Sequence, residues 1–230
     1  MYLRDVRKIL PFPMKNLLLN SLLLLTLLSS CSPGILKNYR KVNTSSLSRN
    51  DFYPFFPSVD STLLFNMQID FRKNHFSGFL IIKSTEPDVY RIGFATHFGM
   101  SVFDLEFDRG SFKVNYCMEA LNRKEVIHLL ENDFRILLFL NLDKELNLSD
   151  IYRNKNNPSL EINRIKKLYY LKDTEKEMLL EIEAPNFFSS LSYSFSGYND
   201  RFPSVIRISH SKVGVRMGME RIREQEGIWE

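Results

Sequence analysis

An alternation of apolar and polar side chains runs through most of the chain from Leu63 onward. The first stretch covers residues 63–71, and the same period of two returns at 103–107, 112–116, 178–183, 191–195 and 213–219. Successive side chains of a β-strand point to opposite faces of a sheet, so this period indicates strands that bury one face. The pattern therefore predicts about ten strands, most of them antiparallel neighbours.

Short turns and one change of period set the order of these strands. Pro87-Asp88 and Arg109-Gly110 are turn pairs, and they predict a meander of five consecutive strands between Leu63 and Tyr116. Apolar residues then fall at helical spacing, which predicts an amphipathic helix over about 122–139, with Asn122 and Glu125 as a capping pair. Residues 141–160 are polar and rich in Asn, which is typical of a loop or short helix. Strands resume at 165–171.

We expect one α+β domain over residues 61–225. Residues 31–60 are polar and interrupted by proline, which favours a tether, with Phe52 docking on the folded body. A large antiparallel sheet has an apolar face to cover, and either two packed sheets or a near-closed barrel would do so. One helix covers little of it, so part of the concave face is expected to remain as a cavity. The predicted fold is a strongly curved antiparallel sheet forming an unclosed β-barrel, with one or two covering helices.

The N-terminal segment has the features of an export signal. Lys15 precedes a leucine-rich stretch, Leu17–Leu28, which is too short to span a bilayer and has no polar helical face. Leu28-Ser29-Ser30-Cys31 then resembles the lipobox of the lipoprotein signal peptidase. We therefore expect residues 1–30 to be a signal peptide and Cys31 to carry diacylglycerol and palmitate. Translation from Met1 and from Met14 both remain open.

Charge and the residues after Cys31 bear on location and partners. The formal net charge is +4, but four basic residues and one acid lie before Cys31, so most of the excess belongs to the signal segment. Basic residues elsewhere are mixed with acids, so we expect no nucleic-acid partner. Two or three acyl chains give stable membrane anchoring. Residues 32–36 contain no acid, which favours the periplasmic face of the outer membrane, since acids there resemble inner-membrane retention or surface-export signals.

Several blocks resemble a known family. Phe76-Ser77-Gly78, Phe98-Gly99-Met100, the strand 103–106 and the helix 129–134, together with the lipobox, make the chain similar to Bacteroidota lipoproteins with a LolA/LolB-like carrier fold. The resemblance implies an unclosed barrel, lidded by helices, that holds acyl chains. For such a cavity, the apolar residues Phe65, Met67, Phe103, Leu105, Phe107, Leu130 and Phe134 are the candidate lining. No functional arginine or loop leucine of that family matches by motif.

Residues able to perform chemistry are few and scattered. The four histidines lie outside any zinc-binding spacing, so we expect no metal site and no cofactor. Glu125 and His128 have a di-iron spacing, but a solvated helix face is the simpler interpretation. Asp104, Glu106 and Asp108 share one strand face, which could hold paired catalytic acids or calcium, but the solvated face of an edge strand is the simpler interpretation. Cys117 is expected to be a small buried hydrophobe rather than a nucleophile. These features predict a protein that is not an enzyme.

Two functions remain open from the sequence. In the first, a membrane-anchored lipoprotein binds a lipid or a lipoprotein acyl chain in its hydrophobic cavity and acts as a carrier or acceptor in envelope biogenesis. In the second, the core is filled, and the protein is a non-catalytic interaction partner, an accessory subunit of an outer-membrane assembly. Fold alone does not decide between them.

Overall fold

The computed structural model describes residues 34–52, 59–71, 73–142, 147–186, 189–199 and 202–222. The chain forms two compact units, Met1–Lys37 and Asn38–Glu230. Of the first unit only the short 3₁₀ helix η1 (Gly34–Leu36) and Lys37 are described. The expected signal peptide, the lipobox and Cys31 therefore lie outside the described residues. No helix in the described part is long and apolar enough to cross a membrane.

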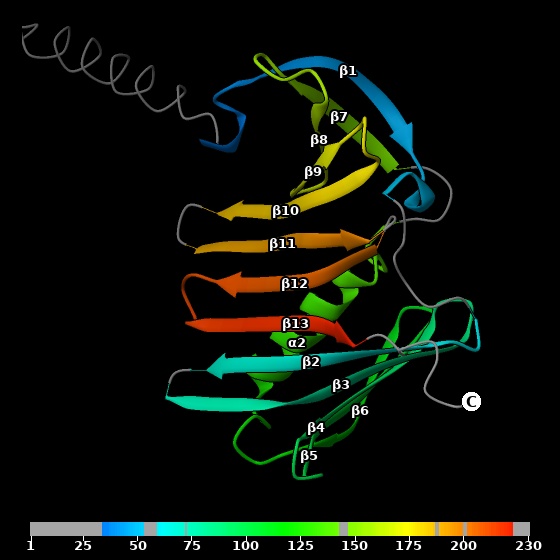
Figure 1. Cartoon of the computed structure of the whole chain (residues 1–230), viewed down its shortest axis with the longest axis vertical. Helices are drawn as coiled ribbons and strands as arrows, with labels where there is room; N and C mark the ends of the chain where they lie inside the picture. Colours follow the sequence, from blue (N-terminus) through cyan, green and yellow to red (C-terminus); the bar gives the residue numbers. More distant parts are fainter. Residues whose placement is uncertain are drawn as a thin grey trace, which may run out of the picture. The chain divides into compact units, whose positions relative to one another are not determined.

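The second unit is a single antiparallel sheet of thirteen strands with one α-helix among its described residues (Figure 1). The strands are β1 (Tyr39–Leu47), β2 (Thr62–Phe71), β3 (Asn74–Glu86), β4 (Val89–Thr96), β5 (Ser101–Asp108), β6 (Ser111–Cys117), β7 (Asn147–Asn154), β8 (Leu160–Ile165), β9 (Leu168–Asp173), β10 (Met178–Asn186), β11 (Ser189–Asn199), β12 (Phe202–His210) and β13 (Val215–Ile222). The helix is α2 (Lys124–Leu137), and a 3₁₀ turn, η2 (Arg49–Phe52), follows β1.

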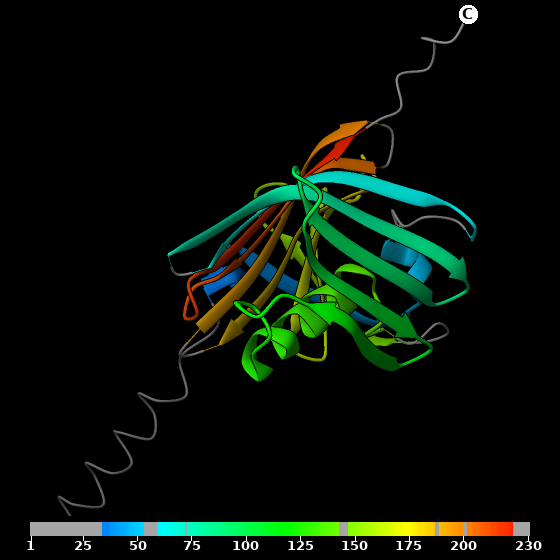
Figure 2. The same ribbon diagram turned by 90° about the horizontal axis from the view of Figure 1, so that it is seen from below.

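The sheet is open and curled. Its strand order is β1-β7-β8-β9-β10-β11-β12-β13-β2-β3-β4-β5-β6, so β1 and β6 are its two edges. Strands β2 to β6 form the predicted meander, and β13 pairs with β2 to join it to the C-terminal strands. Figure 2 shows the strands of this unit arching over α2, which lies against the concave face.

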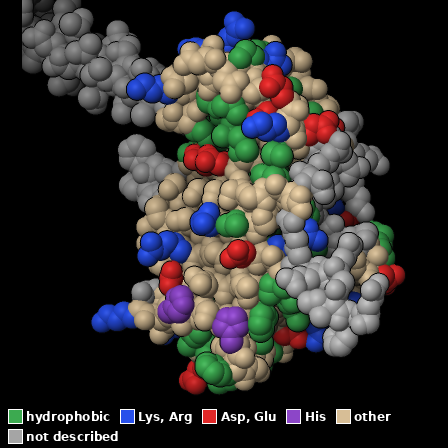
Figure 3. Space-filling view, viewed as in Figure 1, with side chains coloured by type: hydrophobic (Ala, Val, Ile, Leu, Met, Phe, Trp, Pro, Cys, Tyr) green, Lys and Arg blue, Asp and Glu red, His purple; other side chains and the backbone are tan. Residues whose placement is uncertain are grey.

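The alternation seen in the sequence corresponds to the two faces of this sheet. The concave face carries one core to which every strand from β2 to β5 and from β10 to β13 contributes. Its fully buried large side chains include Phe65, Phe94, Phe103, Phe107, Phe134, Tyr170 and Tyr193. The outer face is polar along β11, where serines alternate with the buried residues. Figure 3 shows basic and acidic side chains interspersed over this side of the molecule.

Turn chemistry places the first hairpins as expected. β3 and β4 are joined by Pro87 and Asp88, and Asp88 has a positive φ of 62°. Arg109 and Gly110, with φ of 45° and 105°, join β5 to β6. Positive φ at both central residues matches the right-handed twist of paired strands, which is why such two-residue loops close hairpins.

Three expectations about the strands are wrong. Residues 39–47 form β1, an edge strand paired with β7, so the folded unit begins well before residue 61. Residues 147–154, expected in a loop or short helix, form β7. The single strand expected at 165–171 is a hairpin, because Lys166 adopts a positive φ of 55° and turns the chain between β8 and β9.

The start of the helix also differs from the expectation. Arg123 is the N-cap residue of α2, and its side chain makes no capping hydrogen bond. Asn122 lies in the turn that precedes the helix, where its N–H donates to the carbonyl of Met118 at 2.9 Å. The helix is held by burial of its apolar side, with Leu130, Phe134, Ile136 and Leu137 in the core. Tertiary packing of that side stabilises the helix in place of a capping residue.

Candidate ligand-binding site

An apolar pocket lies between the N-terminal half of α2 and the strands β2 and β13. Its volume is about 150 Å³. The helix contributes Val126, Leu129 and Leu130, and the facing strands contribute Ile69, Phe71, Val215 and Met217. Leu121 and Val213 complete the apolar wall, and Arg123 and Glu125 lie at its rim. The pocket exists because α2 covers only part of the concave face.

One buried carboxyl group fastens α2 to the sheet. Asp133 is 0% exposed and lies one turn beyond Leu130 on the same helix. The Tyr193 hydroxyl donates to its Oδ1 at 3.1 Å, and His210 Nε2 lies 2.7 Å from its Oδ2. Burial raises the pKa of Asp133, and the hydrogen bond and charge of His210 oppose that rise. Burial and the neighbouring Asp133 raise the pKa of Tyr193 well above its usual value.

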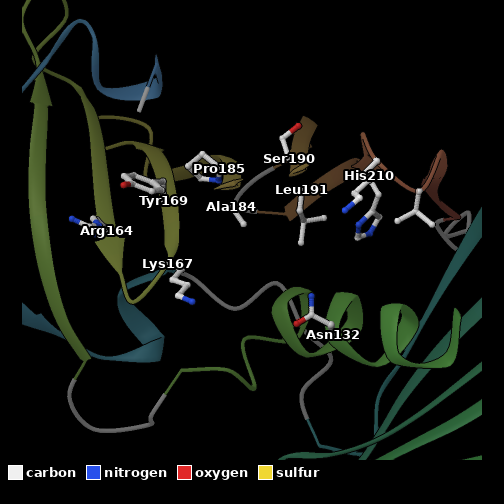
Figure 4. Close-up of a pocket in the computed structure, with 11 residues that line it drawn as sticks. Asn132, Arg164, Lys167, Tyr169, Ala184, Pro185, Ser190, Leu191 and His210 are labelled. Atoms are coloured by element: carbon white, nitrogen blue, oxygen red, sulfur yellow. The ribbon is translucent and has the colours of Figure 1, made fainter. Parts of the chain in front are cut away.

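A second and larger pocket opens beside the contact between Asp133 and His210. It has a volume of about 480 Å³ and is formed by three hairpin ends and α2. Figure 4 shows Asn132 of α2, Ala184, Leu191 and His210 directed toward the same space, with Lys167 reaching toward it from the β8–β9 turn. Arg164, Tyr169, Pro185, Ser190, Lys212 and Val213 complete the lining. The Arg164 guanidinium lies 5.7 Å from the centre of the ring of Tyr169, which lines the same pocket.

The residues expected to line a cavity are mostly packed within the core. Phe65, Met67, Phe103, Leu105, Phe107 and Phe134 are fully buried there. Leu130 lines the apolar pocket, and Phe103 also borders a groove on the outer face. The alternation of β2 and β13 could have pointed to Ile69, Val215 and Met217, because these residues share the buried face. Nothing in the sequence marks which part of that face the helix leaves uncovered.

Exposed apolar side chains occur on β3 and in the loop after β4. Phe79 and Ile81 of β3, together with Phe98 and Met100 of the loop, are all exposed, and Phe98 is 94% exposed. We call these four residues the outer patch. A shallow groove of about 560 Å³ is lined by Phe79 and Ile81 of this patch, by Gly93, Ala95 and His97, and by eight further residues, including Phe103. Exposed apolar side chains are typical of an interaction site where they are contiguous.

The remaining candidate groups have local partners. Arg91 donates to Asp104 through both Nε and a terminal nitrogen, and Asn115 donates to Glu106 at 3.2 Å. The hydrogen bond from Arg91 lowers the pKa of Asp104. His128 lies 3.7 Å from Glu131 rather than beside Glu125. In the described part of the chain, no three His, Cys, Asp or Glu residues gather as a metal site would require.

Cys117 is partly buried at the end of β6. Its thiol lies 3.7 Å from the carbonyl of Met118, and burial raises its pKa. A thiolate is the reactive form of cysteine, so a raised pKa lowers reactivity at neutral pH. This environment is that of a packed side chain, as the sequence suggested.

Fold and pockets together define a protein built on one open, curled antiparallel sheet with a helix on its concave face. No family model and no curated protein matches the sequence. Among solved structures the chain is similar to a LolA superfamily protein from Nitrosomonas europaea, with a TM-score of 0.40 and 6% identity over 77% of this chain and 92% of that chain. It is also similar to a domain from Vibrio parahaemolyticus assigned provisionally to outer membrane lipoprotein sorting, with a TM-score of 0.32 and 10% identity over 74% and 88% of the two chains. These TM-scores are too low to assign a family or a function.

Proposed function

We propose that this chain binds the hydrocarbon chain of a lipid or lipoprotein between α2 and the concave face of the sheet. The apolar pocket beneath α2 is the observation that carries the proposal. Its walls come from the side chains of two elements, helix and sheet, that are joined across the core by packing and by the Asp133 contacts. A ligand chain can therefore extend the same packing without any chemical step, as a carrier or acceptor requires.

The size of the pocket limits what binds while α2 stays in place. An apolar cavity of about 150 Å³ accommodates a benzene-sized group, or about six carbons. At about 0.8 kcal/mol for each buried CH₂, six carbons contribute about 5 kcal/mol, which corresponds at best to a dissociation constant of roughly 0.2 mM. A long acyl chain would bind more tightly, and it needs α2 to move outward. The helix is thus the lid of the proposed site, and Asp133 holds it closed.

The experiment uses an exported Cys31→Ala chain, which carries no acyl groups of its own. Organic extraction of the purified protein should yield lipid in stoichiometric amount, and a fluorescent fatty acid should bind and be displaced by that lipid. Leu129→Trp fills the pocket and should abolish binding while the protein stays folded. His128→Trp is the matched control, because His128 is on the same helix with its side chain 82% exposed. Absence of lipid, or equal binding by both variants, would rule out the proposal.

The proposed setting is the periplasmic face of the outer membrane, reached through a lipid anchor on Cys31. The support is the lipobox-like Leu28-Ser29-Ser30-Cys31 and the absence of acids just after it. Labelled palmitate should attach to the chain in cells, and intact mass should report cleavage before Cys31. An unprocessed N-terminus would rule out the proposed membrane anchor. The proposal that the pocket beneath α2 binds lipid would still stand.

The outer patch favours a second candidate function, that of a non-catalytic interaction protein in an envelope assembly. All four of its apolar side chains are exposed, Phe98 most of all. This role requires no ligand in the core. A double variant, Ile81→Ser with Phe98→Ser, should abolish a specific complex and leave fatty-acid binding unchanged. Val42→Ser, an exposed apolar residue on β1, is the control. Suppose that the unaltered chain binds no lipid but forms the complex, and that the double variant does not form it. The second function then replaces the first.

A further inference from the structure

The two pockets beside α2 are neighbours along the same helix. Val213, in the turn between β12 and β13, lines both of them. On the helix, Leu129 and Leu130 line the apolar pocket and Asn132 lines the larger one. A ligand whose chain lies in the apolar pocket would therefore place its other end in the larger pocket.

The larger pocket differs in chemistry from its apolar neighbour. Lys167 lies in the β8–β9 turn and His210 forms part of the wall (Figure 4). Lys212, in the β12–β13 turn, also lines the pocket. Asn132 and Ser190 add polar groups, and no Asp or Glu among the described residues lines it. Neither lysine forms an ion pair with a carboxylate in the described residues. The pocket thus presents two lysines that have no carboxylate partner in the described part of the chain.

His210 is oriented by its contact with Asp133, which joins α2 to the sheet. Its Nε2 contacts the buried Asp133, which leaves Nδ1 as the ring nitrogen for other partners. When His210 is protonated, the carboxylate of Asp133 at Nε2 balances its charge, and Nδ1 can donate a hydrogen bond to a ligand. A buried carboxylate behind a histidine fixes the ring orientation, so this donor is held in position before a ligand arrives.

We propose that the larger pocket binds the phosphate of an anionic phospholipid whose acyl chain enters the apolar pocket. This inference rests on the proposed lipid binding and adds the head group that is selected. A volume of about 480 Å³ exceeds what a bare phosphate requires and lies within the range of sites for small organic ligands. Lys167, Lys212 and His210 supply charge-assisted hydrogen bonds to phosphate oxygens, which are stronger than bonds between neutral groups.

The experiment compares short-chain lipids of equal length on the Cys31→Ala chain. Dioctanoyl phosphatidylglycerol should bind at least about tenfold more tightly than dioctanoylglycerol, which lacks phosphate, because charge-assisted contacts each contribute about a factor of ten. Lys167→Gln combined with Lys212→Gln should remove most of this preference and leave the neutral lipid unaffected. Lys167→Arg with Lys212→Arg should retain it. Lys83→Gln with Lys113→Gln is the control for net charge, because neither lysine lines the larger pocket.

Further measurements distinguish a phospholipid from free phosphate as the ligand, and failure of the head-group proposal from failure of lipid binding. Added salt should weaken the anionic lipid and not the neutral one, a test that needs no variant. Inorganic phosphate should compete only weakly, because it lacks the chain. If phosphate competes as well as the phospholipid does, the pocket is a site for the free anion and the inference fails. Equal binding of the two lipids overturns the head-group proposal while lipid binding stands. Binding of neither lipid overturns both.

Discussion

Asp133 of α2 and His210 of β12 meet across the core, with Oδ2 and Nε2 2.7 Å apart, although 77 positions separate them in the sequence. The carboxyl group is fully buried and the imidazole borders the larger pocket. The pair therefore joins the lid helix to the wall of the proposed head-group site. Any change at this contact acts on both the stability of the fold and the position of the helix.

This contact predicts a pH-dependent effect of His210→Ala. Burial raises the pKa of Asp133, and His210 supplies the main opposing interaction, so its removal raises that pKa further. A carboxyl whose folded-state pKa is raised contributes stability below its unfolded pKa, near about 4, and that stability is lost as pH rises through the folded value. The free energy of unfolding lost by His210→Ala should therefore be larger at pH 7 than at pH 4. Urea unfolding at both pH values measures it.

The size of that effect follows from the unpaired carboxylate. At pH 7 the loss should be about 3 kcal/mol, since one partner of a buried pair is removed. His128→Ala, on the exposed side of the helix, should cost less than about 0.5 kcal/mol at both pH values. A penalty for His210→Ala that is constant with pH would show that Asp133 does not change protonation over this range.

Gly78 on β3 predicts a strong steric effect. An added Cβ would lie 1.9 Å from the carbonyl oxygen of Ala95 and 2.6 Å from the Cα of Thr96, both on the backbone of the neighbouring segment. Backbone atoms cannot turn aside, so β3 and β4 would have to separate. Gly78→Ala should lower the free energy of unfolding by about 2 kcal/mol or more.

Gly93, on the adjacent strand β4, provides the control for Gly78. A Cβ there meets nothing within 4 Å. Gly93→Ala should leave stability unchanged or raise it by about 0.5 kcal/mol, because alanine loses less backbone entropy on folding. Equal effects of the two alanine substitutions in denaturant unfolding would contradict the close approach at Gly78.

Much of the sheet could be predicted because most strands bury one face and expose the other. Period two marks β2, β5, β6, β10, β11 and β13, short turns mark the meander from β2 to β6, and the helical spacing of Val126, Leu130 and Phe134 located α2. The strands β1 and β7, at the N-terminal edge of the sheet, could not be predicted in this way. β1 is almost entirely exposed, so it shows no apolar alternation. β7 buries Asn147 and Ser149, so its inward positions look polar in the sequence.

The candidate site could be predicted only in part, for a related reason. Period two identifies which side chains face inward, and Ile69, Val215 and Met217 are among them. It does not say where α2 crosses the sheet, because that depends on contacts such as Asp133 with Tyr193 and His210, which no local spacing encodes. The larger pocket joins hairpin turns from three parts of the chain, and Lys167 lies in a turn that looked like a strand.

Cys117 is predicted to be slow toward thiol reagents. Burial raises its pKa, so less thiolate is present at pH 8 than in an exposed cysteine. In the Cys31→Ala chain it is the remaining cysteine. Its alkylation by iodoacetamide should be at least about tenfold slower in the folded protein than in urea at the same pH. Equal rates would place the thiol at the surface and contradict the packing at the end of β6.

The finding that β1 belongs to the sheet predicts the outcome of two truncations. β1 covers the edge of β7, and Phe52, which follows it, is 2% exposed with its ring centre 4.7 Å from that of Tyr170. A chain starting at Asn38 should retain the thermal stability of the Cys31→Ala protein. A chain starting at Val59 loses β1 and Phe52 together, and it should be less stable than Phe52→Ala, for which we expect a loss of about 3 kcal/mol. An uncovered β7 edge should also promote aggregation. If the shorter chain unfolds at the same temperature as the longer one, residues 39–52 act as a tether after all. The proposed site could then lie farther from the membrane, because the tether would be longer.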